Sequence, residues 1–253
     1  MSRIISPVLT PVVTKTVSDP LGITGTSWTP LDLFKSGDTG FLFDSSYKAN
    51  FWQDAARTTP VTASGDLVGS AEDAVFGNFA TQTTDANRPT WTNESFNTDG
   101  VSTHLKTSFT PTNEGTVIVV GTLMALGAQL LSSYITGSFP TTACSLAARG
   151  DGALQGIVGN SGQFYAGASL LNIYGVNILS YDATSATIFR NTSQIASASR
   201  SGTLSGAIPL YIGCTNDNGT ASAFADFNYR AAIYITRAIT PAERQLIVDY
   251  YGA

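Results

Sequence analysis

Charged side chains are scarce in this chain of 253 residues. Lysine, arginine, aspartate and glutamate together make up 12% of it, whereas roughly 25% is usual for a soluble globular domain. The 13 basic residues form no cluster, and the net charge is −5. A protein that binds nucleic acid needs a concentration of basic side chains for the phosphate backbone. We therefore expect no nucleic-acid partner.

Cysteine and histidine are also rare. Cys144 and Cys214 are the only cysteines, and their wide spacing, with no histidine near either, matches neither a zinc site nor a disulfide framework. We expect both to be small buried hydrophobic residues. The single histidine, His104, falls in an expected strand, with no cysteine near it in the sequence and no serine in a nucleophile-elbow motif. We expect it to be a structural or surface residue.

Long apolar runs are missing as well. No stretch reaches the length of a membrane span. At the N-terminus, Pro7 and Pro11 interrupt the apolar residues, so that the hydrophobic region of a signal peptide does not form. We expect synthesis in a cytoplasm without export, and no membrane partner.

Residues 1–36 differ from the rest of the chain. Pro7, Pro11 and Pro20 alternate with valine, isoleucine and threonine, which favours extended, non-helical backbone. One interpretation is a first edge strand packed on the domain, and the other is an extended arm that docks on a partner or on sister copies. An apolar strip of this kind buries little of itself when alone, so we favour the arm.

From Gly37 on, the sequence predicts short antiparallel strands. Residues 115–123 are almost continuously β-branched, which is typical of a central strand covered on both faces. Residues 177–197 contain two strand runs around the turn "DATS", followed by a second polar turn at "RNTS". Further strands are expected at 40–44, 206–214 and 228–236. In the last of these, alternation places four side chains on one face: Tyr229, Ala231, Ile233 and Ile235.

Only the C-terminal end has a helical pattern. Thr240, Pro241 and Glu243 form a capping-box sequence, which predicts a helix over about 241–251. Its apolar stripe consists of Leu246, Ile247 and Tyr250. Many short strands with one terminal helix predict a two-sheet antiparallel sandwich over residues 37–253.

Separated motifs in this region resemble a known family. The hairpin "LSYDATSATIFRNTSQIAS", the run "SGTLSGAIPLYIGC" and the strand and helix "ITRAITPAERQLIVDYY" resemble the C-terminal half of the concanavalin A-like lectin/glucanase jelly rolls of the laminin-G-like group. The resemblance covers roughly residues 40–253. It implies an all-β fold, an antiparallel two-sheet jelly-roll sandwich with one short C-terminal helix, here preceded by the N-terminal arm.

Two further stretches narrow the resemblance. "FWQDAARTTPVTASGDLVG" (51–69) and "NFATQTTDANRPTW" (78–91) are similar to a head segment of jelly-roll proteins encoded by tailed bacteriophages. Arg57, Ser64 and Leu67 stand where that pattern has glycine, aspartate and proline. The resemblance implies a place in a virion, after synthesis in the cytoplasm of the bacterial host.

The segment 51–69 has two interpretations. We expect a packed surface loop, in which glycines allow tight turns around Asp66 while Trp52 and Val61 hold the loop to the sandwich. The alternative is a sugar-binding cleft lined by Phe51 and Trp52, because exposed aromatic rings beside polar groups bind carbohydrate.

A calcium site is the one metal site that the sequence leaves open. Hard oxygen ligands of the kind that calcium prefers occur close together at Asn216, Asp217, Asn218 and Asp226. Some laminin-G-like domains bind calcium at a rim loop. Turn chemistry selects the same run of asparagine, aspartate and glycine. We favour the turn and expect no cofactor, with calcium as the alternative.

Enzymatic activity is not expected. Glycosidases need two facing carboxylates, and the glucanase branch of the fold carries them as Glu-x-Asp-x-x-Glu on one strand. The four glutamates here are scattered: Glu72, Glu94, Glu114 and Glu243. A glycan-degrading enzyme is therefore the least favoured hypothesis.

The leading hypothesis is a non-enzymatic structural protein of a bacteriophage virion, decorating the capsid or associated with the tail. It would display the lectin-like jelly roll on the particle surface and contact other virion proteins and sister subunits, partly through the arm. The alternative is a carbohydrate-binding adhesin that contacts host surface glycans. A fold does not decide between them, because function lies in particular sites.

Overall fold

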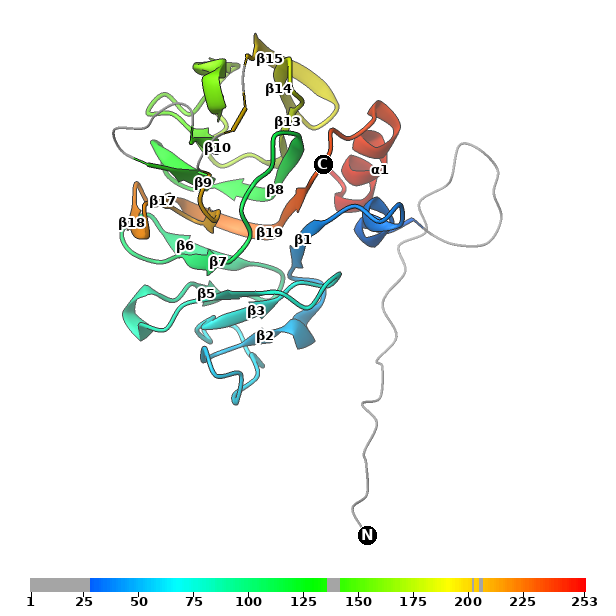
Figure 1. Ribbon diagram of the computed structural model, residues 1–253. Coiled ribbons are helices and arrows are strands. Elements are labelled where there is room, and N and C mark those ends of the chain that lie inside the picture. The colour runs from blue at the N-terminus through cyan, green and yellow to red at the C-terminus, as the bar shows by residue number, and fades with distance from the viewer. Residues whose placement is uncertain (1–27, 136–141, 202, 205–206) are drawn as a thin grey trace.

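The computed structural model describes residues 28–135, 142–201, 203–204 and 207–253, and it is a sandwich of two β-sheets (Figure 1). Among the named strands of these residues, every pairing is antiparallel except that of β17 with β9. The predicted all-β two-sheet sandwich with one C-terminal helix is confirmed. No helix in the described ranges is long and apolar enough to cross a membrane.

Eight strands form the first sheet: β1 (Gly40–Asp44), β5 (Thr90–Trp91), β6 (Phe96–Asp99), β8 (Gly115–Leu123), β13 (Tyr174–Tyr181), β14 (Ser185–Arg190), β15 (Ser193–Ser199) and β19 (Asp226–Ile235). Eleven form the second: β2 (Phe51–Trp52), β3 (Ser70–Glu72), β4 (Phe79–Thr81), β7 (Leu105–Thr107), β9 (Ala128–Tyr134), β10 (Cys144–Ala148), β11 (Leu154–Val158), β12 (Gln163–Ala166), β16 (Tyr211–Ile212), β17 (Thr215–Asp217) and β18 (Thr220–Ser222). The helices are α1 (Pro241–Tyr251) and the short 3-10 helices η1 (Pro30–Phe34), η2 (Lys48–Asn50), η3 (Asp85–Asn87) and η4 (Gly159–Ser161).

The strand β8 lies in the middle of the first sheet and contributes to two cores. Val117 and Val119 pack between the two sheets, whereas Ile118 and Val120 pack on the opposite face, under α1 and η1. Successive side chains of a strand point to opposite faces, so a continuous apolar run fills both cores. The prediction of a central strand covered on both faces is confirmed.

The other predicted strands are mostly present. Residues 40–44 form β1, and residues 177–197 lie in the hairpins of β13, β14 and β15. In the second hairpin turn Asn191 has a φ of 54°, a left-handed conformation that asparagine adopts more readily than most residues. Of the strand predicted at 206–214, the structure describes residues 207–214, and among these only Tyr211 and Ile212 have strand structure. The two cysteines are buried and form no disulfide, as expected.

A β-bulge corrects the predicted face of the last strand. Tyr229 packs in the core between the sheets, whereas Ala231 and Ile233 lie under the helix. The pairing of β19 with β8 shifts between Tyr229 and Ala231, so Arg230 is an extra residue. A bulge of one residue reverses the alternation of side chains beyond it. The sequence pattern of residues 228–236 therefore held only from Ala231 onward.

The C-terminal helix begins with the predicted cap. Thr240 Oγ1 accepts a hydrogen bond from the Glu243 backbone N–H at 3.2 Å, and the Glu243 carboxylate accepts one from the Thr240 N–H at 2.7 Å. The buried stripe is Ile247, Val248 and Tyr251, one residue further on than predicted. The hydroxyl of Tyr251 donates to a buried Asp44 oxygen at 2.7 Å, which holds that side of the helix against the sheet.

Part of the predicted arm belongs to the sandwich. Trp28 packs edge-on against Tyr250 of α1, with 6.1 Å between the ring centroids, and Leu33 is buried in the core under the helix. In Figure 1, η1 lies beside α1. Residues 28–36 therefore belong to the domain, because their apolar side chains fill the space between helix and sheet. The rest of the predicted arm, residues 1–27, lies outside the described residues, so its attachment role stays a prediction.

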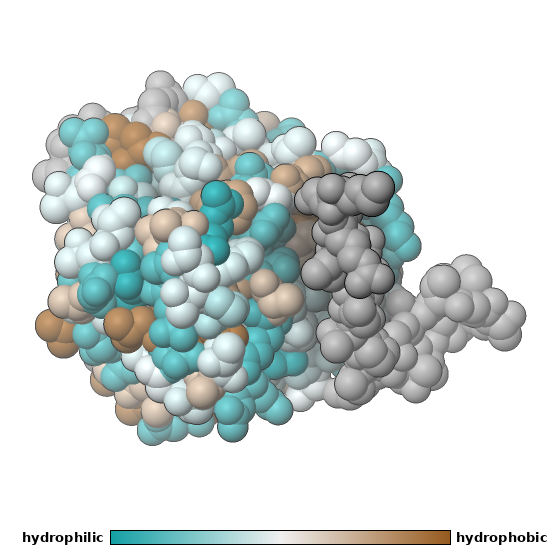
Figure 2. Space-filling model, turned by 90° about the horizontal axis from the view of Figure 1, so that it is seen from below, coloured by the Kyte–Doolittle hydropathy of each residue, from teal (hydrophilic) through white to brown (hydrophobic). Residues whose placement is uncertain are grey.

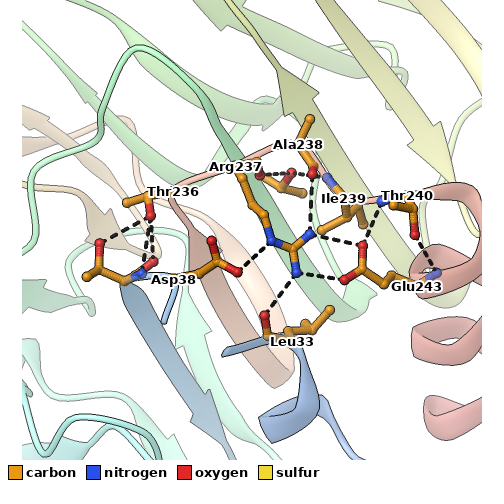
Figure 3. Close-up of polar contacts among 10 residues, drawn as sticks. Leu33, Asp38, Thr236, Arg237, Ala238, Ile239, Thr240 and Glu243 are labelled. Atoms are coloured by element: carbon orange, nitrogen blue, oxygen red, sulfur yellow. Dashed lines mark hydrogen bonds and ion pairs between the residues drawn. The ribbon is translucent and has the colours of Figure 1, made fainter. Parts of the chain in front are cut away.

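A single arginine ties this segment to the helix (Figure 3). Arg237, in the loop between β19 and α1, pairs through Nε with Asp38 at 2.7 Å and through both terminal nitrogens with Glu243 at 2.6 and 2.9 Å. It also donates to the Leu33 carbonyl at 2.9 Å. The planar guanidinium suits this arrangement, because its two terminal nitrogens bond one carboxylate in a fork while its Nε donates to a second carboxylate.

Candidate functional site

The outer face of the eleven-stranded sheet carries the aromatic side chains that are best placed to meet a ligand. Phe51, Leu105, Ile212 and Phe164 point into the core between the sheets, so by strand alternation their neighbours point away from it. This outer face is formed by Trp52, Phe79, Thr81, Lys106, Tyr211, Gln155, Gln163 and Tyr165.

The outer face is long. The order of strands is β12, β11, β10, β9, β16, β7, β4, β3, β2, and neighbouring strands lie about 4.8 Å apart. Eight such steps give a surface about 38 Å across from β12 to β2. In Figure 1 the sheet extends from β2 at the bottom to β10 near the top. The side chains that face outward from the middle strands, Ser132, Ser145 and Ile157, are themselves buried, so the exposed rings lie toward the two ends of the sheet.

At the β2 end of the outer face, the two aromatic residues of the alternative sugar cleft, Phe51 and Trp52, face opposite sides of the sheet. Phe51 is fully buried, with its ring centroid 4.9 Å from that of Trp91. Trp52 is only half-buried and lies 6.4 Å from the Phe79 ring. The prediction of Phe51 as a sugar contact was wrong, because consecutive residues of a strand face opposite sides. Trp52 lies on the outer face and remains a candidate.

The loop 51–69 packs as predicted and places a cation on this end. Val61 is buried, and the Asp66 carboxylate accepts the N–H groups of Thr62 and Ala63 at 2.7 and 2.9 Å. These backbone hydrogen bonds lower the pKa of Asp66. Arg57 has a φ of 62°, at the position where the phage pattern has glycine, and its guanidinium carbon lies 3.7 Å above the Phe79 ring.

The middle of the outer face combines a lysine with stacked rings. Lys106 Nζ lies 5.5 Å from the centre of the Tyr211 ring. The His104 ring stacks near the same tyrosine, with 6.0 Å between the ring centroids. Burial lowers the pKa of His104, and its Nδ1 lies 2.8 Å from the Ser102 carbonyl oxygen. Because the imidazole is buried and hydrogen-bonded within the chain, His104 is a structural residue, as predicted.

The far end of the outer face was missed by the sequence analysis. Tyr165 is 51% exposed, and the guanidinium carbon of Arg149 lies 3.6 Å above its ring. Beside them, the Gln155 amide donates to Gln163 Oε1 at 2.9 Å. The strand β12 is only four residues long and has no clear alternation of apolar and polar residues, so no local pattern indicates that Tyr165 faces outward.

The calcium candidates do not come together in one ligand set. Asn216 uses its side chain inside the hairpin of β17 and β18, donating to the Pro209 carbonyl at 2.6 Å and accepting from the Gly219 N–H at 2.7 Å. Asn218 and Gly219 have φ of 48° and 90°, as a tight hairpin turn requires. Asp217 ends β17 in this hairpin, whereas Asp226 begins β19 in the other sheet. Across the described ranges, no three His, Cys, Asp or Glu side chains are grouped to hold a metal.

A polar groove of about 640 Å³ lies at the edge of the eight-stranded sheet, lined by side chains that include Arg88, Asn97 and Asp99. Arg88 pairs with Asp85 at 2.7 Å. Asp99 Oδ1 accepts hydrogen bonds from the three backbone N–H groups of residues 101–103, each at 2.9 Å. Burial alone would raise the pKa of Asp99, but these bonds hold it well below its usual range. The groove's charged groups are therefore already bonded within the chain.

The side of the molecule seen in Figure 2 is mainly hydrophilic. Apart from the residues drawn in grey, its hydrophobic residues occur as separate small groups. A surface that buries against another protein usually presents a larger continuous apolar patch. This side shows none of that kind outside the grey atoms.

No protein-family model matches the chain, and no curated protein matches its sequence. Among solved structures, a Trypanosoma rangeli sialidase in complex with 2,3-difluoro-KDN has a TM-score of 0.59 at 14% identity, covering 95% of this chain and 36% of that one. Another Trypanosoma rangeli sialidase structure has a TM-score of 0.57 at 15% identity, covering 92% and 35%. The Ruminococcus gnavus IT-sialidase CBM40 bound to α2,3-sialyllactose has a TM-score of 0.46 at 15% identity, covering 55% and 83%.

These likenesses show the fold alone. The chain spans about a third of the length of the Trypanosoma rangeli sialidases that it resembles. The β-sandwich expected from the sequence is supported by an independent set of structures. The resemblance to phage proteins is a separate matter and stays a prediction.

Proposed function

We propose that the protein is a non-enzymatic module that binds carbohydrate on the outer face of its eleven-stranded sheet. The observation that carries the proposal is the presence of half-buried and exposed rings at the two ends of this face, Trp52 and Phe79 at one and Tyr165 at the other, beside amide, guanidinium and hydroxyl groups. A sugar ring offers an apolar face that stacks on an aromatic ring and hydroxyls that hydrogen-bond to polar side chains. The outer face supplies both kinds of group.

The absence of hydrolytic activity is part of the proposal. A glycosidase needs two carboxylates that face one another across the bond to be cleaved. Glu243 is bound by Arg237, and Asp99 is bound by backbone N–H groups. The other three glutamates belong to separate elements: Glu72 in β3, Glu94 between β5 and β6, and Glu114 before β8.

A role in a bacteriophage particle is a second candidate function and is compatible with the first. The observation that favours it is the resemblance of residues 51–69 and 78–91 to phage jelly-roll proteins. In that setting the sandwich would face outward toward host glycans. Deletion of residues 2–27 removes none of the described strands and helices, and we expect the truncated protein to fold but to be absent from purified particles. Wild-type occupancy in particles would contradict an attachment role for that segment.

Glycan binding is tested by affinity electrophoresis and calorimetry against a panel of polysaccharides. Trp52→Ala and Tyr165→Ala should each weaken binding about fivefold, because a ring stack contributes about 1 kcal/mol. Tyr174→Ala is the matched control, since Tyr174 is 40% exposed but lies on β13 in the other sheet. Unchanged affinity in both outer-face variants would place the site elsewhere. No binding of any polysaccharide by the wild-type protein would contradict the function itself.

A further inference from the structure

The aromatic rings of the outer face share one feature: a cation lies over each of three of them. Arg57 lies 3.7 Å above Phe79 and Arg149 lies 3.6 Å above Tyr165. At the middle of the face Lys106 lies 5.5 Å from the Tyr211 ring centre. All three distances fall within the range of cation–π attraction. In a chain with a net charge of −5, three cations are thus held on one sheet face.

These cations keep their hydrogen-bond donors available. A guanidinium that lies flat on a ring uses its π face for stacking, and its N–H groups point outward in its own plane. Within the described ranges, no acceptor bonds the side chain of Arg57, and no carboxylate lies within 4 Å of it or of Lys106. Arg149 has one loose partner, Asp151, at 3.8 Å, and that carboxylate is itself 58% exposed.

The stacking also changes what the outer face presents to a ligand. At Phe79 and Tyr165 the cation lies over one face of the ring, so a ligand that approaches there meets a guanidinium as well as an aromatic surface. A guanidinium binds carboxylate or sulfate groups through two parallel hydrogen bonds, and this pairing is stronger than one with a neutral hydroxyl.

The cations are spaced along the sheet. Lys106 on β7 and Tyr165 on β12 are five strand steps apart, which is about 24 Å, whereas Phe79 lies on β4, next to β7. A single sugar cannot reach both ends of such a distance. A polymer with a repeated negative charge can contact all three cations at once, and contacts linked in one chain add to the overall affinity.

We infer that the ligand of the outer face is an anionic polysaccharide, one that carries carboxylate or sulfate groups and is held by Arg57, Lys106 and Arg149. This inference rests on the proposed function and specifies its ligand class. Stacking on Trp52 and Tyr165 contributes affinity, and the cations select for negative charge. Because Arg57 is exposed and Lys106 and Arg149 are only half-buried, the selectivity weakens as the salt concentration rises.

The test compares three probes with the wild-type protein: polygalacturonate, which is carboxylated, heparin, which is sulfated, and dextran, which is neutral. We expect binding of at least one anionic polymer to be more than tenfold tighter than binding of dextran at low salt, with the difference shrinking at 0.5 M NaCl. The two anionic probes distinguish carboxylate from sulfate as the preferred group. Equal affinity for dextran would overturn the inference and leave the proposed function standing, whereas no binding of any probe would count against both.

Variants assign the effect to the outer face. Arg57→Gln and Arg149→Gln should each weaken binding of the anionic polymer about tenfold and leave dextran binding unchanged. Arg244→Gln is the matched control, because Arg244 also stacks on a ring, 3.8 Å above Phe189, but belongs to α1 on the opposite side. An equal loss in Arg244→Gln would mean that net charge alone governs binding and would overturn the assignment. If a variant failed to fold, the comparison of polymers on the wild-type protein would still decide the ligand class.

Discussion

Removing the guanidinium of Arg237 should detach the N-terminal segment from the helix (Figure 3). Arg237 makes charge-assisted hydrogen bonds to Asp38 and Glu243, and its own side chain is 24% exposed while theirs are 20% and 22% exposed. A hydrogen bond to a charged group contributes about 1.5–3 kcal/mol when buried, whereas an exposed ion pair contributes about 0–1 kcal/mol. The low exposure of all three side chains places the energy of these contacts nearer to that of a buried charged hydrogen bond. We therefore expect Arg237→Met to lower the free energy of unfolding by about 3 kcal/mol.

The size of this effect is measured by urea and thermal unfolding at pH 7. For a domain of this size, a loss of about 3 kcal/mol corresponds to a fall in Tm of about 6–12 °C. Arg237→Lys keeps the charge but loses the fork, so it should cost about half as much. Lys35→Met is the control, because Lys35 pairs with Asp32 but is 72% exposed, and its loss should cost less than about 0.5 kcal/mol.

The pH dependence of this effect follows from Glu243. Burial raises the pKa of Glu243, but Arg237 and the Thr240 backbone lower it, and the net direction is downward from 4.5. The stabilisation is therefore complete above pH 4.5 and is lost as the pH falls through the lower pKa of the folded state. The gap in stability between wild type and Arg237→Met should narrow in acid. A cost below about 1 kcal/mol at pH 7, or a gap that stays constant down to pH 2, would refute the reasoning.

Three further predictions concern other parts of the sandwich. Burial and the charge of Asp99 opposite it raise the pKa of Asp226, so Asp226→Asn should stabilise the protein by about 0.5 kcal/mol at pH 7. That gain should vanish below pH 3.8, where the carboxyl is protonated in both states; urea unfolding at pH 7 and pH 3 checks this, and a loss of stability at pH 7 would contradict it. A Cβ on Gly69 would lie 2.6 Å from the backbone oxygen of Gln53, whereas one on Gly150 would meet nothing within 4 Å. Calorimetry should therefore show a loss of about 2 kcal/mol for Gly69→Ala and almost none for Gly150→Ala; similar values for the two would argue against this packing. Burial lowers the pKa of His104, so the folded state binds its proton less readily than the unfolded state, and stability should fall as the pH drops below 6.5. The urea midpoint between pH 7.5 and 5 should show this slope in the wild type and a flatter one in His104→Gln; the same slope in both would contradict it.

The parts of the fold that were predicted from the sequence are those fixed by local patterns. The capping box at Thr240 and Glu243 needs only neighbouring residues, and its hydrogen bonds formed as expected. The β-branched run 115–123 can be covered on both faces wherever it lies in a sheet, and it became the central strand β8. Such signals survive because tertiary structure does not need to override them.

The parts that were missed depend on contacts between distant residues. The extra residue Arg230 can be recognised only from the pairing of β19 with β8. Because of this residue, Tyr229 packs between the two sheets and not under the helix. Leu33 is an ordinary apolar residue in a proline-rich segment, and its burial depends on the helix more than 200 residues later. Tyr165 of the candidate site was missed for the same reason, because its place on the outer face depends on the position of β12 at the edge of the sheet.

The measurement that tests the account most directly is a hydrogen-exchange footprint of the protein with and without polygalacturonate. If the polymer binds the outer face, exchange should slow in β2 with Trp52, in β7 with Lys106 and in β12 with Tyr165, and should not change in α1. The same pattern should be absent with dextran at equal concentration. Protection confined to the groove around Arg88 and Asp99, or to the eight-stranded sheet, would contradict the assignment of the outer face as the binding site.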